Sequence, residues 1–323
     1  MIQQLKKLLS FLKPYLRWAI LGGVLFFLGQ TLIDRWQEVV DRISHADWTC
    51  ILIALGITLL AHICAGWVWI WSLQALRQSV HPVRLVQIYM KTTIAKYLPG
   101  NVWHYYGRIK VATQENVPLE VATVSTLLEP VLMSAAALLV ALLGSLQLTR
   151  PNPVQGLQVL GLIVSLIALH PWVLNPLVRL AGKLKLKAKG TNSNQNTVNR
   201  TLFRIERYPF LPLLGSILFL ILRCLGFLLI ILALAPVPLD QVRFIFSAFS
   251  FAWLIGMIAP GFPGGLGVFE SIAFALLSPI FPGEVALSAV AIYRLTNTLA
   301  ETAGAGLCWV DEWRCRHPIP GQK

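Results

Sequence analysis

Charged residues are scarce in this chain. They make up 13% of its 323 residues, whereas a soluble domain carries about 25%. Acidic residues are rarer than basic ones, with 14 Asp and Glu against 27 Lys and Arg. Hydrophobic residues make up 56% of the chain. This composition excludes an ordinary soluble domain. It predicts an all-α, polytopic membrane protein with a single integral membrane domain over residues 1–323.

Sequence motifs of catalysis and metal binding are also missing. The chain has no GxSxG, HExxH or DxD motif, and no Walker or dinucleotide-binding loop. Its five cysteines show no CxxC or Cys/His ligand spacing, and most lie in apolar runs, where a small buried hydrophobe is the simpler role. We therefore expect no catalytic residue, no metal site and no cofactor.

Long apolar runs dominate the chain instead. Six of them approach or exceed the roughly 20 residues that a helix needs to cross a bilayer, and they cover residues 18–33, 51–71, 121–146, 154–174, 211–234 and 285–310. We predict about six full transmembrane helices. The first run follows a basic N-terminus but lacks a small-residue cleavage site, so we expect a retained span rather than a signal peptide.

Basic residues gather beside these runs. Four precede the first run with no acid among them, and eight share segment 178–208 with a single acid, Glu206. Basic residues in short loops mark the cytoplasmic side of a membrane. We therefore predict a basic cytoplasmic loop at 178–208, cytoplasmic N- and C-termini, and a multi-pass protein of the bacterial inner membrane. Anionic lipids, and not nucleic acid, are the expected partners of this charge.

Two Pro-Gly breaks interrupt apolar sequence, one in each half of the chain. The first is Pro99-Gly100, and the second runs from Pro260 to Gly267. Pro removes a backbone donor and Gly frees the backbone, so helices must stop there. The flanking segments are too short or too polar to cross alone, which predicts two re-entrant hairpins. Charge bias points them in opposite directions, as in an inverted repeat, whereas the alternative of full spans would place loop 178–208 outside.

Seven ionisable residues lie in or beside the apolar segments. Each costs about 2.5–3.5 kcal/mol at a helix centre on insertion scales. They are Lys96, Arg108, Glu129, Arg223, Glu270, Arg294 and Glu301. Such charges either pair to hold a bundle together or line a polar path, and the sequence leaves both roles open.

Each break offers a way to hold a headgroup. At the first, Lys96 and Arg108 lie on either side of the break and could hold a phosphate, while Trp103 suits a headgroup-level position. The alternative is an interfacial anchor that binds nothing specific. At the second, the glycines permit close backbone approach, and Glu270 either caps the following helix or faces a headgroup.

These two breaks resemble the two sequence boxes of a known family. Residues 96–103, KYLPGNVW, followed by Arg108, resemble the KY-hydrophobic-PG-x-VW…R box of the lysylphosphatidylglycerol synthase transmembrane, or flippase-like, family. Residues 263–270, PGGLGVFE, resemble its PGG-hydrophobic-G-x-x-E box, although Phe269 stands where many relatives have Arg. Glu129 and Tyr293-Arg294 also fit. The resemblance covers nearly the whole chain.

The resemblance implies a membrane domain that moves or presents lipids. In aminoacyl-lipid synthases a separate soluble domain performs aminoacyl transfer, so we do not expect this chain alone to aminoacylate lipid. We predict a lipid flippase or translocase that binds a phospholipid or lipid-linked headgroup in a groove between the hairpins. The candidate binding residues are Lys96, Pro99, Gly100, Trp103, Arg108, Glu129, Pro263, Gly264, Gly265, Gly267, Glu270, Arg294 and Glu301.

Two other functions fit the same residues. One is a membrane glycosyltransferase or an accessory subunit of a lipid-modifying enzyme, and the other is a structural scaffold whose buried charges serve folding alone. The expected partners are membrane lipids, anionic or lipid-linked. A lipid-modifying enzyme and further copies of the chain are compatible with the sequence as additional partners.

Overall fold

The computed structural model describes residues 36–98, 102–145, 153–176, 208–259 and 262–316. The predicted first span at 18–33 and all of the predicted basic loop except Tyr208 lie outside these ranges. Within them the regular structure is helical throughout, with no strand. This confirms the predicted all-α fold class.

Four helices have the length and apolar composition needed to cross a membrane. They are α3 (Trp48–Ala75), α6 (Leu119–Ser145), α10 (Phe210–Leu234) and α11 (Leu239–Ile258). The shortest, α11, has 20 residues and is therefore about 30 Å long, which matches the hydrocarbon core of a bilayer. The chain is thus an integral, multi-pass membrane protein.

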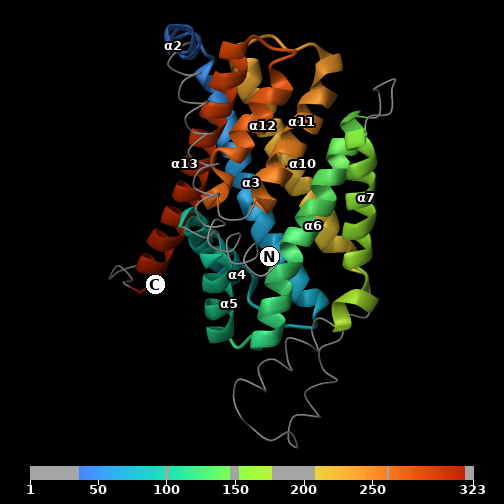
Figure 1. The fold of residues 1–323 in the computed structure, drawn as a ribbon. Coiled ribbons are helices and arrows are strands. Elements are labelled where there is room, and N and C mark those ends of the chain that lie inside the picture. The colour runs from blue at the N-terminus through green and yellow to red at the C-terminus, as the bar shows by residue number, and fades with distance from the viewer. Residues whose placement is uncertain (1–35, 99–101, 146–152, 177–207, 260–261, 317–323) are drawn as a thin grey trace, which may run out of the picture.

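The remaining long helix, α13 (Gly283–Arg316), has 34 residues and runs along most of the bundle (Figure 1). It contains the predicted span at 285–310. The predicted span at 154–174 is shorter than expected, because α7 (Pro153–Ala168) ends six residues early. The reason is Pro171, which cannot donate the next helical hydrogen bond and disfavours a helical conformation at His170.

Helix α11 is longer than the sequence pattern suggested. The apolar segment at 244–258 was expected to be too short to cross, but the helix begins at Leu239, directly after Pro238. Asp240 lies in the first turn, where a carboxylate is favoured by the positive end of the helix dipole. The helix therefore starts before the apolar residues begin.

The first break lies between two short helices, α4 (Pro82–Thr93) and α5 (Trp103–Gln114). Each has 12 residues and is about 18 Å long, well short of a bilayer crossing. They pack against each other, and the 3₁₀ turn η1 (Ile94–Tyr97) extends α4 toward the break. This pair forms the first hairpin.

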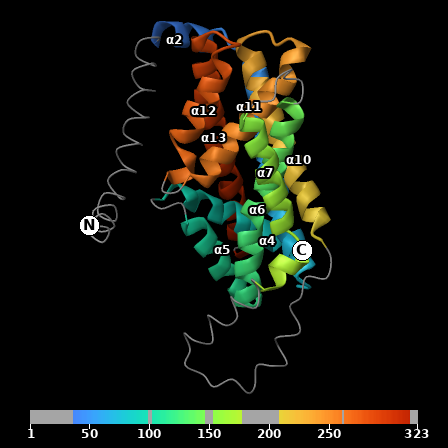
Figure 2. The same ribbon diagram turned by 45° about the vertical axis from the view of Figure 1, so that its right-hand side comes forward.

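The second hairpin consists of α11, the 3₁₀ turn η2 (Pro263–Gly265) and α12 (Val268–Leu277). In both ribbon views it occupies the upper half of the bundle, whereas α4 and α5 occupy the lower half (Figures 1 and 2). The tips of the two hairpins meet, since η1 contacts η2. A Cβ atom built on Gly264 would lie 3.0 Å from Cε1 of Tyr97.

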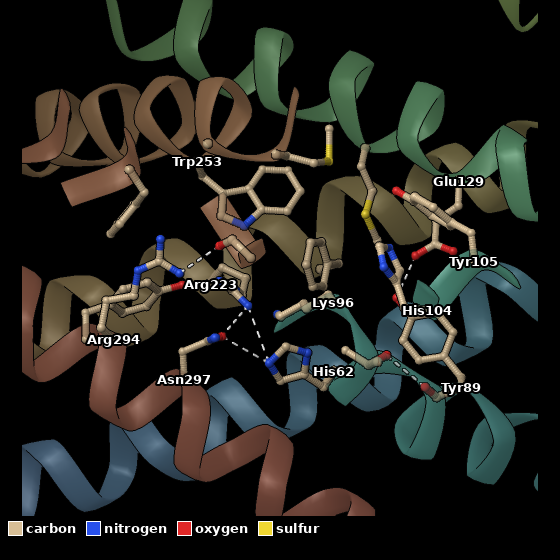
Figure 3. Close-up of a pocket in the computed structure, with 18 of the residues that line it drawn as sticks. His62, Tyr89, Lys96, His104, Tyr105, Glu129, Arg223, Trp253, Arg294 and Asn297 are labelled. Atoms are coloured by element: carbon tan, nitrogen blue, oxygen red, sulfur yellow. Dashed lines mark hydrogen bonds between the residues drawn. The ribbon is translucent and has the colours of Figure 1, made fainter. Parts of the chain in front are cut away.

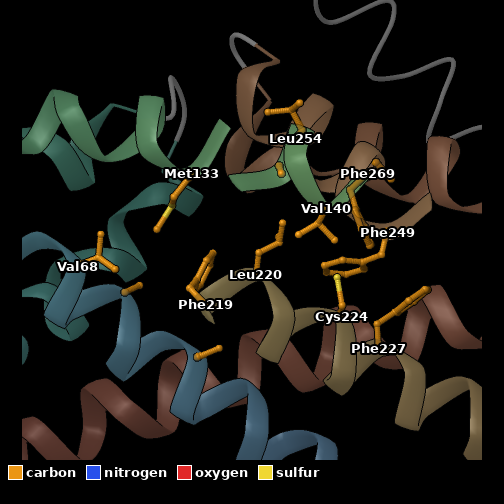
Figure 4. Packing of buried hydrophobic residues seen from close by; sticks show 14 of the residues in the cluster. Val68, Met133, Val140, Phe219, Leu220, Cys224, Phe227, Phe249, Leu254 and Phe269 are labelled. Carbon is orange, nitrogen blue, oxygen red and sulfur yellow. The ribbon is translucent and has the colours of Figure 1, made fainter. Parts of the chain in front are cut away.

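Four aromatic rings from four helices support the second hairpin, and those of Phe227, Phe249 and Phe269 are labelled in Figure 4. They are Phe227 of α10, Phe249 of α11, Phe269 of α12 and Tyr293 of α13, with ring centroids 5.1 to 6.5 Å apart. Edge-to-face pairs at these separations add stabilisation beyond burial of area. They fix the inner end of α12 against the long helices. The small helix α2 (Trp36–Ser44) lies beside the upper end of α13 (Figure 1).

Candidate functional site

A cavity of about 130 Å³ lies where the hairpin tips meet the long helices (Figure 3). It has room for several waters or for a polar group of comparable size. Four cations line it, each from a different element: Lys96 of η1, Arg108 of α5, Arg223 of α10 and Arg294 of α13. Glu129 and Gly264 also line it. The structure thus brings predicted residues from both breaks to one place.

Lys96, which lines this cavity, forms an ion pair with Glu301, which does not itself line it. Nε2 of His62 lies 3.2 Å from Oε1 of Glu301, and Nδ2 of Asn297 donates to the same oxygen at 3.1 Å. Only 2% of the Glu301 side chain is exposed. Its other oxygen, Oε2, has no hydrogen-bond partner within the described ranges. All the stabilisation of this carboxylate is therefore concentrated on one oxygen.

Arg223 is held without a carboxylate. One of its terminal nitrogens donates to Oδ1 of Asn297 at 2.7 Å and lies 3.4 Å from Nε2 of His62, as the dashed lines in Figure 3 show. Among the residues that the structure places, no Asp or Glu oxygen lies within 4.0 Å of it. Instead the guanidinium carbon lies 5.4 Å from the ring centroid of Tyr293 and 6.0 Å from that of Trp253.

This lack of an anion matters because Arg223 is only 5% exposed. A buried cation without a counter-ion is costly, and cation–π contacts offset about 2 kcal/mol when they are desolvated. Nε of Arg223 and the hydroxyl of Tyr293 are both buried without a hydrogen-bond partner in the described part of the chain. Two donors at one end of the cavity are therefore available to an acceptor.

Arg108 and Glu129 form a self-contained pair at the other end of the cavity. The guanidinium and carboxylate are in direct contact, and the Tyr89 hydroxyl donates to Oε1 of Glu129 at 2.6 Å. The Arg108 guanidinium also stacks over Tyr89, 3.9 Å from the ring centroid. Arg108 is only 1% exposed. Both carboxylate oxygens have partners, so this pair holds α5, α6 and α4 together.

The second tip is closed by its own charges. Arg294 pairs with Glu270 and donates to the carbonyls of Gly264 at 3.0 Å and Gly265 at 2.9 Å. Glu270 in turn accepts from the N–H of Gly267 at 2.7 Å and so caps α12. The carbonyls of Gly264 and Gly265 and the N–H of Gly267 are thus satisfied by side chains of α13 and α12.

Glycine is required at this tip. Gly264, Gly265 and Gly267 have φ of 58°, 69° and 84°, a region that side chains disfavour. A Cβ on Gly265 would also lie 2.5 Å from the carbonyl oxygen of Gly256 in α11. The glycines therefore serve the close approach of η2 to α11.

Some candidate residues lie elsewhere. Trp103 does not line the cavity: 49% of it is exposed, and its ring lies beside Tyr106 on the outer face of α5. The inner face of that helix carries His104 and Arg108, which are one turn apart. Pro99 and Gly100 lie outside the described residues, and Pro263 begins η2.

Several residues of the cavity were not predicted from the sequence. They include His62, Tyr89, His104, Trp253 and Asn297. Asn297 could have been predicted from the sequence, because it lies three residues after Arg294 and four before Glu301 and therefore on the same face of α13. His62 is a polar residue inside an apolar span and carried a weaker one.

The family model described as "Lysylphosphatidylglycerol synthase TM region" matches residues 16–304. The chain belongs to this family. The match covers both breaks and every candidate residue, in agreement with the resemblance of the two sequence boxes. No curated protein sequence matches the chain significantly. Membership of the lysylphosphatidylglycerol synthase TM family relates this membrane protein to lipid modification or transport.

Phe269 lies directly before Glu270 near the start of α12. Its ring is buried in the aromatic group formed with Phe249 and Tyr293. The guanidinium carbon of Arg294 lies 5.0 Å from its centroid. The position thus supports Arg294 and the second tip through packing.

Proposed function

We propose that this protein is a lipid translocase that holds an anionic headgroup in the cavity between its two hairpin tips. The observation that carries the proposal is Arg223, a buried cation that faces the cavity with no carboxylate partner in the described structure. A phosphate oxygen would supply the missing acceptor. Arginine and tyrosine donors suit phosphate because a guanidinium binds it in a bidentate way.

The charge balance around the cavity supports an anionic ligand. The four lining cations face three carboxylates, Glu129, Glu270 and Glu301, each of which is already paired with a different cation. One positive charge is left over. The site therefore has a net positive charge that attracts an anionic headgroup, and intramembrane charges that are not merely structural commonly mark a transport path.

In a membrane, the two hairpins would be re-entrant and enter from opposite faces. For the first hairpin, the short α4 and α5 support this, because neither is long enough to cross. For the second, α12 has only 10 residues, and α11, although long enough to cross by itself, is apolar only over residues 244–258. The tips would then meet near the midplane, where irregular backbone survives only beside protein or a polar cavity. With the apolar run at 18–33, the chain would have about six full spans, an inverted-repeat arrangement and both termini in the cytoplasm of a bacterial cell.

The outer side of the first tip suits acyl chains. Leu98, Val102, Trp103 and Tyr106 are exposed there, while Lys96 on the same tip lines the cavity. A lipid could therefore place its headgroup against Lys96 and Arg223 while its chains remain in the bilayer. The boundary between these two surfaces is the route that we propose for the lipid.

Reconstitution into vesicles tests this function. Purified protein in phosphatidylcholine vesicles, with trace fluorescent phosphatidylglycerol or phosphatidylcholine, is followed by quenching of the outer leaflet. We expect the anionic lipid to cross faster than in protein-free vesicles, and Arg223→Gln to slow it about tenfold or more. Arg243→Gln, which removes an exposed cation of α11 away from the cavity, is the matched control and should not slow it. Movement no faster than in protein-free vesicles would refute the proposal.

A further inference from the structure

We infer that Glu301 is a proton-binding site that couples headgroup movement to the movement of one proton. The inference rests on the proposed translocase function and adds its driving force. It starts from the geometry of a single carboxylate whose two oxygens differ. Oε1 receives Lys96, His62 and Asn297 from three elements, whereas Oε2 has no hydrogen-bond partner among the placed residues.

The groups that face Glu301 come from every side of the site. They are His62 of α3, Lys96 and Tyr97 of η1, His104 of α5, Arg223 of α10, and Tyr293 and Asn297 of α13 itself. Lys96 is the closest cation and the most exposed of the four that line the cavity, at 20% of its side chain. It also belongs to the hairpin tip.

Lys96 is therefore the cation that an incoming phosphate can engage most easily. Arg108 and Arg294 are each fixed by a carboxylate and, for Arg294, by two backbone carbonyls. Lys96 is held by Glu301 through a flexible side chain. A headgroup that binds Lys96 and Arg223 competes directly with Glu301 for Lys96.

Loss of Lys96 changes the protonation of Glu301. A buried carboxylate without a cation strongly favours its neutral form, and a nearby phosphate charge acts in the same direction. A hydronium ion on the side from which the headgroup enters supplies the proton, which bonds to Oε2, the oxygen without a partner, and leaves a water molecule. When the headgroup leaves on the other side, Lys96 returns to Glu301, the O–H bond breaks, and the proton passes to water on that side. One phosphate charge and one proton thus cross together, and the step is electroneutral.

Glu129 is the internal contrast. It is also a buried glutamate beside the cavity, but both of its oxygens are occupied, one by Arg108 and one by Tyr89. Its cation is almost inaccessible to a ligand. We therefore expect Glu129 to stay bound to Arg108 and Tyr89 while a headgroup passes, and Glu301 to be the carboxylate that exchanges its partner.

The experiment uses a proton gradient across vesicles that contain the full chain. Phosphatidylcholine vesicles with trace fluorescent phosphatidylglycerol receive a gradient of about one pH unit, with valinomycin and equal potassium holding the electrical potential at zero. If one proton moves with each lipid, this gradient can sustain at most about a tenfold ratio of the fluorescent lipid between the two leaflets. The prediction is accumulation in the leaflet facing the alkaline side, beyond that in protein-free vesicles and absent for fluorescent phosphatidylcholine.

Variants locate the proton. Glu301→Gln should abolish the accumulation, and Glu120→Gln, a glutamate in the first turn of α6 outside the Lys96–Glu301 cluster, should retain it. His62→Gln keeps the carboxylate and tests whether the proton resides on the imidazole instead. Loss of accumulation in His62→Gln together with its retention in Glu301→Gln would assign the proton to His62 and overturn our assignment.

Two results separate this inference from the translocase proposal. Rapid lipid movement in the wild-type protein with an even final distribution would overturn proton coupling and leave the translocase function standing. No movement above protein-free vesicles would overturn both. Because each result is read on the wild-type protein, the test does not depend on whether a variant folds.

Discussion

The two hairpin tips use the same sequence device, a Pro-Gly break, in different ways. The second tip is closed: Arg294 binds the carbonyls of Gly264 and Gly265, and Glu270 binds the N–H of Gly267. The first tip offers a side chain to the cavity, since Lys96 is held by an ion pair with Glu301, 205 positions away in the chain, and by a cation–π contact with Tyr97, 5.2 Å from its ring centroid. The second tip is thus stabilised by contacts to its own backbone, whereas Lys96 of the first tip can exchange one side-chain partner for another.

This difference shows what a broken helix needs inside a membrane. A break frees polar backbone groups, and these must be satisfied by protein or water. The second tip meets that need with one salt bridge aimed at its own backbone. We propose that the first tip carries the ligand because its charge is committed to another side chain and not to the backbone.

The largest expected effect is loss of the salt bridge at the second tip. Glu270→Gln removes the partner of Arg294 and the cap of α12, so we predict a loss of about 3–5 kcal/mol in stability. Thermal unfolding in detergent should show a clear drop in Tm. The double variant Glu270→Gln with Arg294→Gln leaves no buried unpaired charge and should be less destabilised than the sum of the single variants. An unchanged Tm would mean that the tip is not held by this pair.

The next effect concerns the backbone of that tip. Gly265→Ala forces a side chain into φ of 69° and against the Gly256 carbonyl, which should cost about 2 kcal/mol or more. Gly306→Ala in α13 is the matched control, because a Cβ there meets nothing within 4 Å. It should be neutral or stabilising by about 0.5–1 kcal/mol. Equal Tm values for Gly265→Ala and Gly306→Ala would contradict tight packing of η2 against α11 at the second tip.

At the first tip we expect function to suffer more than stability. Lys96→Met should slow translocation of anionic lipid about tenfold, which corresponds to about 1.4 kcal/mol in the barrier. Its Tm should fall less than that of Glu270→Gln, because Glu301 keeps His62 and Asn297 as neighbours. Adding Glu301→Gln should restore stability but not transport. A Lys96→Met variant with normal transport and a strongly lowered Tm would contradict this prediction, because Lys96 would then serve stability, as the salt bridge of the second tip does.

The smallest effect lies at the outer end of the first hairpin. Glu312 of α13 pairs with Arg84 and Lys91 of α4, at 3.2 and 2.7 Å, in partly exposed positions. Such pairs are typically worth about 0.2–1 kcal/mol and weaken with salt. Glu312→Gln should lower the Tm slightly at low ionic strength and less at high ionic strength. A loss as large as that of Glu270→Gln would show that the first hairpin, too, is fixed by salt bridges.

Much of the fold and part of the site followed from composition and local chemistry. The apolar runs predicted α3, α6 and α10 because length and hydrophobicity decide a membrane crossing. The charged residues in apolar sequence were found because burying charge is costly enough to be conspicuous. The role of Glu270 as a helix cap followed from its place just after the glycines.

What could not be predicted depends on distant parts of the chain. The partner of Lys96 is 205 positions away, and no local pattern selects Glu301 over Glu129 or Glu270. The start of α11 was predicted too late because the polar residues Asp240, Gln241 and Arg243 concealed its first turn. Trp103 was included among the candidates because its side chain suits a headgroup-level position, and the phase of α5 turns it outward, away from the cavity.

The most direct test of the central claim is lipid retention at Arg223. Wild-type protein and the variants Arg223→Gln and Arg243→Gln are purified from vesicles that contain equal amounts of phosphatidylglycerol and phosphatidylcholine, and bound lipid is measured by mass spectrometry. We predict that the wild type and Arg243→Gln retain the anionic lipid preferentially and that Arg223→Gln loses this preference. Equal retention of both lipids by the wild type, or an unchanged preference in Arg223→Gln, would contradict a headgroup site between the hairpin tips.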